Sequence, residues 1–65
     1  MTAGDLQQVT TGMNREDVLK IGPPASRITM FDDGHLVEIY RYMTGDTSLG
    51  VVRLTDGSVS SIQVR

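Results

Sequence analysis

The chain has 65 residues, of which 38% are hydrophobic and 22% charged, so its composition is that of a folded domain and not of a disordered chain, and its length excludes two independent cores. Its net charge of −2, from six Lys and Arg against eight Asp and Glu, argues against nucleic acid as the main partner, because phosphate binding needs a clustered basic face. The absence of cysteine excludes disulfides, and no apolar run approaches the roughly 20 residues of a membrane-spanning helix.

The chain is predicted to consist of a flexible leader, residues 1–11, and a single domain, residues 12–65. The leader is polar apart from Leu6 and Val9. It also lacks the charged-then-apolar layout of a secretory signal. We therefore place the core-forming elements after residue 11.

A short helix is predicted over residues 15–21. Asn14 is a good N-cap, because its side-chain oxygen can accept a hydrogen bond from the backbone N–H of Asp17. The Asp17 carboxylate can reach back to the cap in a variant of the capping box, and Met13 and Val18 have the spacing of a hydrophobic staple. These signals together define where the helix begins.

The predicted helix ends at Gly22, which offers a left-handed C-cap, and Pro23 and Pro24 prevent its continuation. A helix of fewer than two turns is not stable alone in water. Its apolar side chains must therefore pack on the rest of the chain, and these are Met13, Val18, Leu19 and Ile21.

Short strands joined by tight turns are predicted beyond the helix, over residues 27–31, 36–42, 49–54 and 59–64. Asp33-Gly34 and Asp56-Gly57 are strong hairpin signals, and residues 43–48 form a turn-rich connection. Parallel pairs would need long crossovers, so the strands should be antiparallel. The predicted fold class is α+β, with one short N-terminal helix packed on a three- to four-stranded antiparallel β-meander.

Alternation along the strands indicates which side chains share a face. Val52 and Leu54 should point inward, with Val51 and Arg53 outward. In the strand over residues 36–42 both faces carry apolar groups, so the pattern leaves open which face meets the helix. The other face would then be a partly exposed apolar surface, which in a small domain suggests a partner.

No catalytic, cofactor or metal site is predicted, and we expect the chain not to be an enzyme. His35 follows a hairpin turn and is better explained as a surface residue than as a catalytic base. Asp32, Asp33 and His35 match the spacing of neither a zinc site nor a calcium loop. The glycines separate individual elements and do not form a phosphate-binding loop.

Tyr40 and Tyr42 share one face of a predicted strand and, with Arg41 and Arg53, are the candidate interface residues. One interpretation gives the tyrosines a core or protein-interface role. The other is a shallow site for an anion or a peptide, which requires Arg27, Arg41 and Arg53 to converge beside the tyrosines.

Three segments carry a resemblance to a known family. They are G-M-N-R-E-D-V-L at residues 12–19 followed by G-P-P at residues 22–24, I-Y-R-Y at residues 39–42, and V-R-L-T-D-G-S-V at residues 52–59. In this order they resemble the SmpA/OmlA (BamE-like) group of small outer-membrane assembly lipoproteins, over residues 10–64. The departures are a stretch one residue shorter before Gly22, Ile21 in place of a leucine, and Ile39 or Tyr40 in place of a tryptophan.

The resemblance implies a non-catalytic protein-interaction module, an outer-membrane assembly or envelope-integrity factor that acts in the periplasm or cell envelope. The printed chain has no signal peptide and no lipobox cysteine. Protein partners, such as the β-barrel assembly machinery, are implied, and the matched residues are structural: Met13, Asn14, Val18, Gly22, Pro23, Asp56 and Gly57. A homodimer formed by strand pairing or N-terminal swapping, and a small ligand- or peptide-binding or sensing domain within a larger protein, stay open as alternatives.

Overall fold

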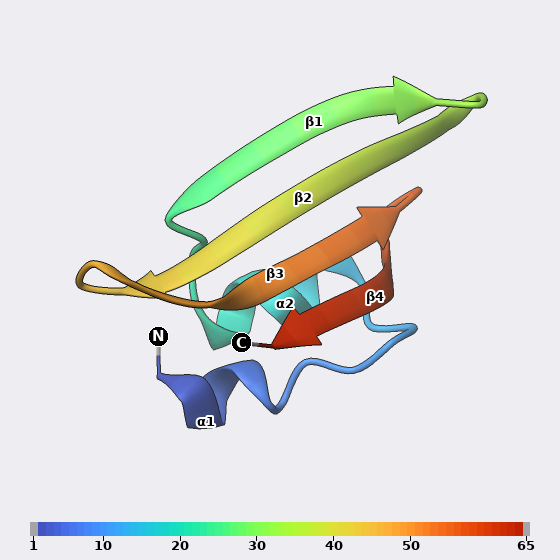
Figure 1. Ribbon diagram of the computed structural model, residues 1–65. Coiled ribbons are helices and arrows are strands. Elements are labelled where there is room, and N and C mark those ends of the chain that lie inside the picture. Colours follow the sequence, from blue (N-terminus) through green and yellow to red (C-terminus); the bar gives the residue numbers. More distant parts are fainter. Residues whose placement is uncertain (1, 65) are drawn as a thin grey trace.

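Two short helices lie against one face of an antiparallel sheet in the computed structural model, which describes residues 2–64 (Figure 1). The elements in chain order are α1 (Ala3–Leu6), α2 (Arg15–Ile21), β1 (Ser26–Asp32), β2 (His35–Thr44), β3 (Thr47–Thr55) and β4 (Ser58–Val64). The four strands pair in the order β1-β2-β3-β4. The prediction of a small α+β fold with an antiparallel meander is thus confirmed.

Helix α2 begins and ends at the predicted residues, but the conformation of Gly22 after it differs from the prediction. The Asn14 side chain accepts a hydrogen bond from the backbone N–H of Asp17 at 2.9 Å. At the other end, Gly22 has φ 171° and ψ 153°, which is extended backbone, so the predicted left-handed cap is wrong. The reason is Pro23, because a proline ring disfavours helical conformations in the residue before it.

Two Asp-Gly pairs form the tight turns of the meander. Asp33 and Gly34 have φ values of 52° and 80°, and Asp56 and Gly57 have 51° and 84°. Positive φ at both central positions is typical of the type I′ turn, whose twist matches that of paired strands. The strands run longer than predicted, since the connection at residues 43–48 shrinks to a turn between Thr44 and Thr47.

The hydrophobic core lies between the helices and the side of the sheet that carries Tyr40 and Tyr42. Both tyrosines are completely buried, so the question left open by the sequence is settled in favour of the even-numbered face of β2. The buried members of this core are Leu6, Val9, Val18, Tyr40, Tyr42, Val52, Leu54 and Val59.

The segment before α2 is folded onto the sheet, which corrects the prediction of a flexible leader at residues 1–11 as far as residues 2–11 are concerned, whereas Met1 lies outside the described residues. Thr2 and Asp5 cap α1 reciprocally, with backbone N–H to side-chain oxygen distances of 3.0 and 3.2 Å. Leu6 and Val9 are both buried in the core. Leu6 packs so closely on Gly50 that a Cβ atom at that glycine would lie 2.8 Å from Leu6 Cδ2. Two apolar side chains are therefore enough to hold this segment.

The two edges of the sheet differ. Along β4, Val59 accepts a backbone hydrogen bond from Gly12 at 2.9 Å and donates one to Met13 at 2.8 Å, so the segment before α2 covers part of this edge. At the other edge, all seven residues of β1 are exposed. The edge of the sheet at β1 is therefore the more accessible one.

Candidate interaction surface

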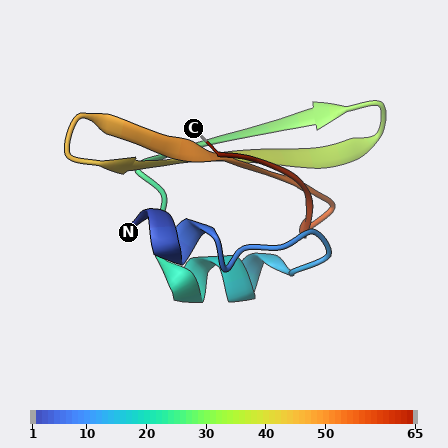
Figure 2. The same cartoon turned by 60° about the horizontal axis from the view of Figure 1, so that its bottom comes forward.

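One face of the sheet lies away from both helices, and we call it the open face (Figure 2). The strand register gives its members. Ile28 lies opposite Ile39, Met30 opposite Val37, and Ile39 opposite Arg53. Ile28 and Met30 are 52% and 40% exposed. The open face is therefore an apolar surface that carries arginines. It comprises Ile28, Met30, Val37, Ile39, Arg41, Val51, Arg53, Ser61 and Gln63, of which Val37 is buried between its neighbours.

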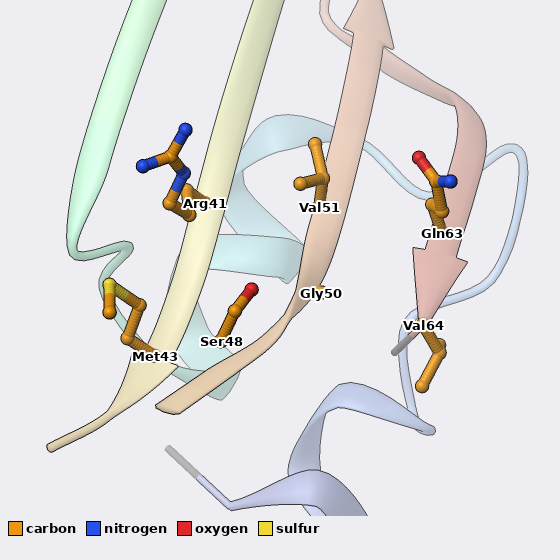
Figure 3. Close-up of a pocket in the computed structure, with 7 residues that line it drawn as sticks. All are labelled: Arg41, Met43, Ser48, Gly50, Val51, Gln63 and Val64. Atoms are coloured by element: carbon orange, nitrogen blue, oxygen red, sulfur yellow. The ribbon is translucent and has the colours of Figure 1, made fainter. Parts of the chain in front are cut away.

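A hollow of about 500 Å³ lies on the open face towards the β2–β3 turn. Arg41, Val51 and Gln63 lie directly opposite one another on β2, β3 and β4, and Figure 3 shows their side chains rising from the sheet on the same side. The complete lining is Arg41, Met43, Ser48, Gly50, Val51, Gln63 and Val64. The hollow thus combines an apolar floor with the cationic Arg41 and the neutral polar side chains of Ser48 and Gln63.

Arg41 is the charged group of the hollow. Its side chain is exposed and makes no ion pair with any of residues 2–64. By contrast, Arg53 lies near Asp32, with 3.8 Å between Nη2 and Oδ2. Arg41 is therefore the arginine of the open face whose hydrogen-bond donors are free to meet an external acceptor.

A buried carboxylate connects helix and sheet on the other side. Glu38 is 5% exposed, and the Nε atom of Arg15 donates to its Oε1 atom at 2.7 Å. Arg15 Nη2 forms an ion pair with the same oxygen, and the Tyr40 hydroxyl donates to Oε2 at 3.0 Å. Both oxygens are occupied by protein groups, so the structure gives this carboxylate a role in joining α2 to β2.

The tyrosines themselves are core residues. Burial, followed by the hydrogen bond to Glu38, raises the pKa of Tyr40 above its usual value. The Tyr42 hydroxyl is buried without a hydrogen-bond partner among residues 2–64, and burial raises its pKa to about 12. Neither ring is available to stack on a base or a peptide.

The candidate interface residues of the sequence therefore do not form one surface. Tyr40 and Tyr42 face the helices, whereas Arg41 and Arg53 lie on the open face, because neighbouring residues of a strand point to opposite sides. Arg27 lies on the tyrosine side, with its guanidinium carbon 6.0 Å from the centre of the Tyr40 ring. An anion or peptide site beside the tyrosines requires these three arginines to converge, but they lie on both faces of the sheet.

His35 and Asp56 link two hairpin turns. The His35 Nδ1 atom lies 2.6 Å from Asp56 Oδ2, and the backbone N–H of Leu36 donates to Asp56 Oδ1 at 3.0 Å. The bond to His35, followed by that from Leu36, lowers the pKa of Asp56. Within residues 2–64, no three His, Cys, Asp or Glu residues are grouped as metal ligands would be.

The sequence motifs are the sole basis for assigning the chain to a family. Comparison with protein-family models, curated proteins and solved structures gave no match. The kinship with the BamE-like family stays a prediction. Among the described residues, no helix has the length and apolar character needed to cross a membrane.

Proposed function

We propose that this chain is a non-catalytic protein-interaction module that binds a partner protein on the open face of its sheet. The observation that carries the proposal is that apolar side chains remain uncovered there, whereas on the opposite face the helices cover the side chains of β2 and β3 that form the core. Ile28 and Met30 are 52% and 40% exposed, and Ile39 and Val51 are only partly buried. A contiguous exposed apolar surface on a small protein is typical of an interaction site.

The hollow around Val51 suggests how a partner would be held. An apolar side chain of the partner fits the floor formed by Val51 and Met43. Arg41 would then donate to a carboxylate or carbonyl oxygen beside that side chain, and Gln63 supplies a neutral donor and acceptor. Arginine next to buried apolar contacts is a frequent feature of protein interfaces.

The cellular role we propose is that of an outer-membrane assembly or envelope-integrity factor, acting in the periplasm or cell envelope. Its support is the order of the motifs at residues 12–24, 39–42 and 52–59, which resembles the BamE-like family. The partner would then be a protein of the envelope, such as a component of the β-barrel assembly machinery.

A site-specific cross-linking experiment tests the proposal. A photoreactive phenylalanine analogue replaces Val51, or, as a matched control, the exposed Lys20 on α2, in the full chain inside cells that produce it naturally. We expect a discrete protein adduct from position 51 and none from position 20. Adducts at neither position, or equally at both, would contradict the use of the open face.

The adduct also tests the cellular role. Mass spectrometry of the adduct identifies the protein attached at position 51. An envelope protein supports the role in outer-membrane assembly, whereas a cytoplasmic protein contradicts it and leaves the interaction function standing.

The hollow also favours a second candidate, a peptide-binding or sensing domain. The lining of the hollow would hold one apolar side chain of a short peptide, and Arg41 would bind an acidic group of the same peptide. An Arg41→Glu variant separates the two candidates: a peptide site loses binding almost entirely, whereas a broad protein interface loses part of its affinity.

A further inference from the structure

We propose that β1 pairs antiparallel with β1 of a second copy of this chain, so that two sheets join into one continuous sheet. The contact uses the edge of the sheet and leaves the hollow around Val51 free, so it does not depend on the partner proposed above. Three features of β1 carry the proposal: its exposure, the direction of its backbone groups and the self-complementarity of its side chains.

Strand β1 lacks the usual features that protect an edge strand. Such strands are commonly short, bulged, interrupted by proline or charged at their centre. β1 has seven residues, its register with β2 has no shift, and its centre reads I-T-M-F. Phe31 is 81% exposed. An edge of this kind is a ready template for another strand.

The direction of the backbone groups of β1 follows from the hydrogen bonds between the strands. The Asp56 N–H donates to the Leu36 carbonyl at 2.8 Å, so the even-numbered residues of β2 direct their backbone groups to β3. The odd-numbered residues of β2 then bond β1, through partners such as Ile28 and Met30. The backbone groups that point away from the sheet therefore belong to Arg27, Thr29 and Phe31.

These three residues are placed symmetrically about Thr29. In an antiparallel pair centred there, Thr29 lies opposite Thr29 of the second copy, and Arg27 opposite Phe31. Each of these is a hydrogen-bonded pair that exchanges two backbone bonds. Since a two-fold rotation exchanges the two strands and leaves the arrangement unchanged, it closes as a dimer and does not propagate as a fibre.

The side chains are complementary in the same register. On the open face, Ile28 lies opposite Met30 of the second copy, beside Ile39 and Val37 of the same sheet. On the helix face, the Arg27 guanidinium can lie over the ring of Phe31 of the second copy, a favourable cation–π arrangement. Cross-strand apolar and cation–aromatic pairs are the contacts that stabilise strand pairing.

The charges of β1 favour this orientation as well. Arg27 lies near one end of the strand and Asp32 at the other. Antiparallel pairing brings the cationic end of one strand to the anionic end of its partner, whereas parallel pairing would place like charges together. A shift of the second strand by two residues in either direction shortens the overlap of the two strands. In one of these shifted registers, Asp32 lies opposite Ile28 of the second copy.

The approach to β1 is unobstructed. In Figure 1, α1 lies below β4 and α2 lies behind β3 and β4, so both helices are on the far side of β2 from β1. α1 contacts β3. A second copy can therefore align along β1 without meeting a helix.

Charge substitution at Thr29 tests the dimer, because the two-fold axis places this residue opposite itself. Thr29 is exposed, so Thr29→Lys and Thr29→Asp keep the fold, which circular dichroism verifies. Each variant alone sets like charges against each other, and we expect its dimer dissociation constant to rise about tenfold or more. A mixture of the two variants sets Lys against Asp and should restore dimers, all of them mixed. Thr11→Lys, at an exposed position far from β1 in the chain, is the matched control and should dimerise like the wild type.

Sedimentation velocity and native mass spectrometry up to millimolar concentration give the readout. A wild-type chain that remains monomeric, Thr29 variants that dimerise as tightly as the wild type, or a mixture that stays monomeric would each overturn the proposal. Because the cross-linking experiment monitors Val51, its outcome is independent of this one.

Discussion

The guanidinium of Arg15, in the first turn of α2, forms an ion pair with the buried carboxylate of Glu38 in β2. The two residues are 23 positions apart in the chain, and the bond between them ties the helix to the centre of the sheet. The Tyr40 hydroxyl donates to the second oxygen of the same carboxylate. Glu38 is thus a polar group inside the core that depends on two partners.

Replacing Glu38 with alanine should destabilise the fold. The change leaves the Tyr40 hydroxyl buried without an acceptor and removes the partner of Arg15, so we expect a loss of about 2 kcal/mol in the free energy of unfolding. The loss stays below that of a fully buried ion pair because the Arg15 side chain is 39% exposed. Glu16→Ala, an exposed acidic residue of the same helix, should change stability by about 0.5 kcal/mol at most. Urea denaturation measures both, and equal losses would contradict this role of Glu38.

Gly50 should not tolerate a side chain. A Cβ atom there would lie 2.4 Å from the Gln63 carbonyl oxygen and 2.8 Å from Leu6 Cδ2. We expect Gly50→Ala to lower the free energy of unfolding by about 2 kcal/mol or more, because overpacking forces backbone and side chains apart. In Gly4→Ala the added Cβ meets only Thr2 Oγ1, at 3.7 Å, so this control should be neutral or stabilising by up to about 1 kcal/mol. A Gly50→Ala variant as stable as the wild type would contradict the close packing of α1 on β3.

The two buried tyrosines should respond oppositely to loss of their hydroxyl groups. Tyr42→Phe removes a buried hydroxyl that has no partner among residues 2–64, so stability should stay the same or rise by about 1 kcal/mol. Tyr40→Phe removes the hydrogen bond to Glu38 and should cost about 1 kcal/mol. Thermal unfolding of both variants checks the contrast. Destabilisation by Tyr42→Phe as large as that by Tyr40→Phe would show that the Tyr42 hydroxyl has a partner.

The Asp56 carboxylate should make stability depend on pH in the acid range. Its pKa in the folded protein lies below the usual value of 3.8, because of the hydrogen bonds from His35 and Leu36. A lowered folded pKa contributes stability above the unfolded pKa, and this contribution is lost as the pH falls through the folded value. We therefore expect Asp56→Asn, which tolerates the positive φ of the turn, to be less stable than the wild type at neutral pH.

The difference between Asp56→Asn and the wild type should close as the pH drops below about 4. Urea denaturation at several pH values measures it, and Asp46→Asn in the β2–β3 turn serves as the control. A difference that persists unchanged in acid would contradict the contribution of the Asp56 charge.

Local signals predicted the elements that depend on local chemistry. Asn14 marks the start of α2, and two Asp-Gly pairs mark the turns between β1 and β2 and between β3 and β4. The strands were found in the right order, and every strand end except that of β4 at Val64 was predicted one or two residues short. The last residue of α2, Ile21, was predicted correctly, but the left-handed conformation expected of Gly22 was wrong, because Pro23 disfavours helical conformations in the residue before it.

The contacts that the sequence could not reveal are the non-local ones. Leu6 and Val9 were too few to predict a folded N-terminal segment, and Leu6 finds its place only because Gly50, far along the chain, has no side chain. Alternation in β2 could not decide which face is buried, because both faces carry apolar residues. The position of the helices decides which face is buried. For this reason Tyr40 and Tyr42 lie in the core, whereas Arg41 and Arg53 lie on the open face.

None of the buried side chains of the described chain belongs to β1. Substitutions in this strand therefore cost the fold little, and related chains can diverge there while they keep the same core. Mutation would in this way change which molecules the domain recognises without first passing through an unstable intermediate.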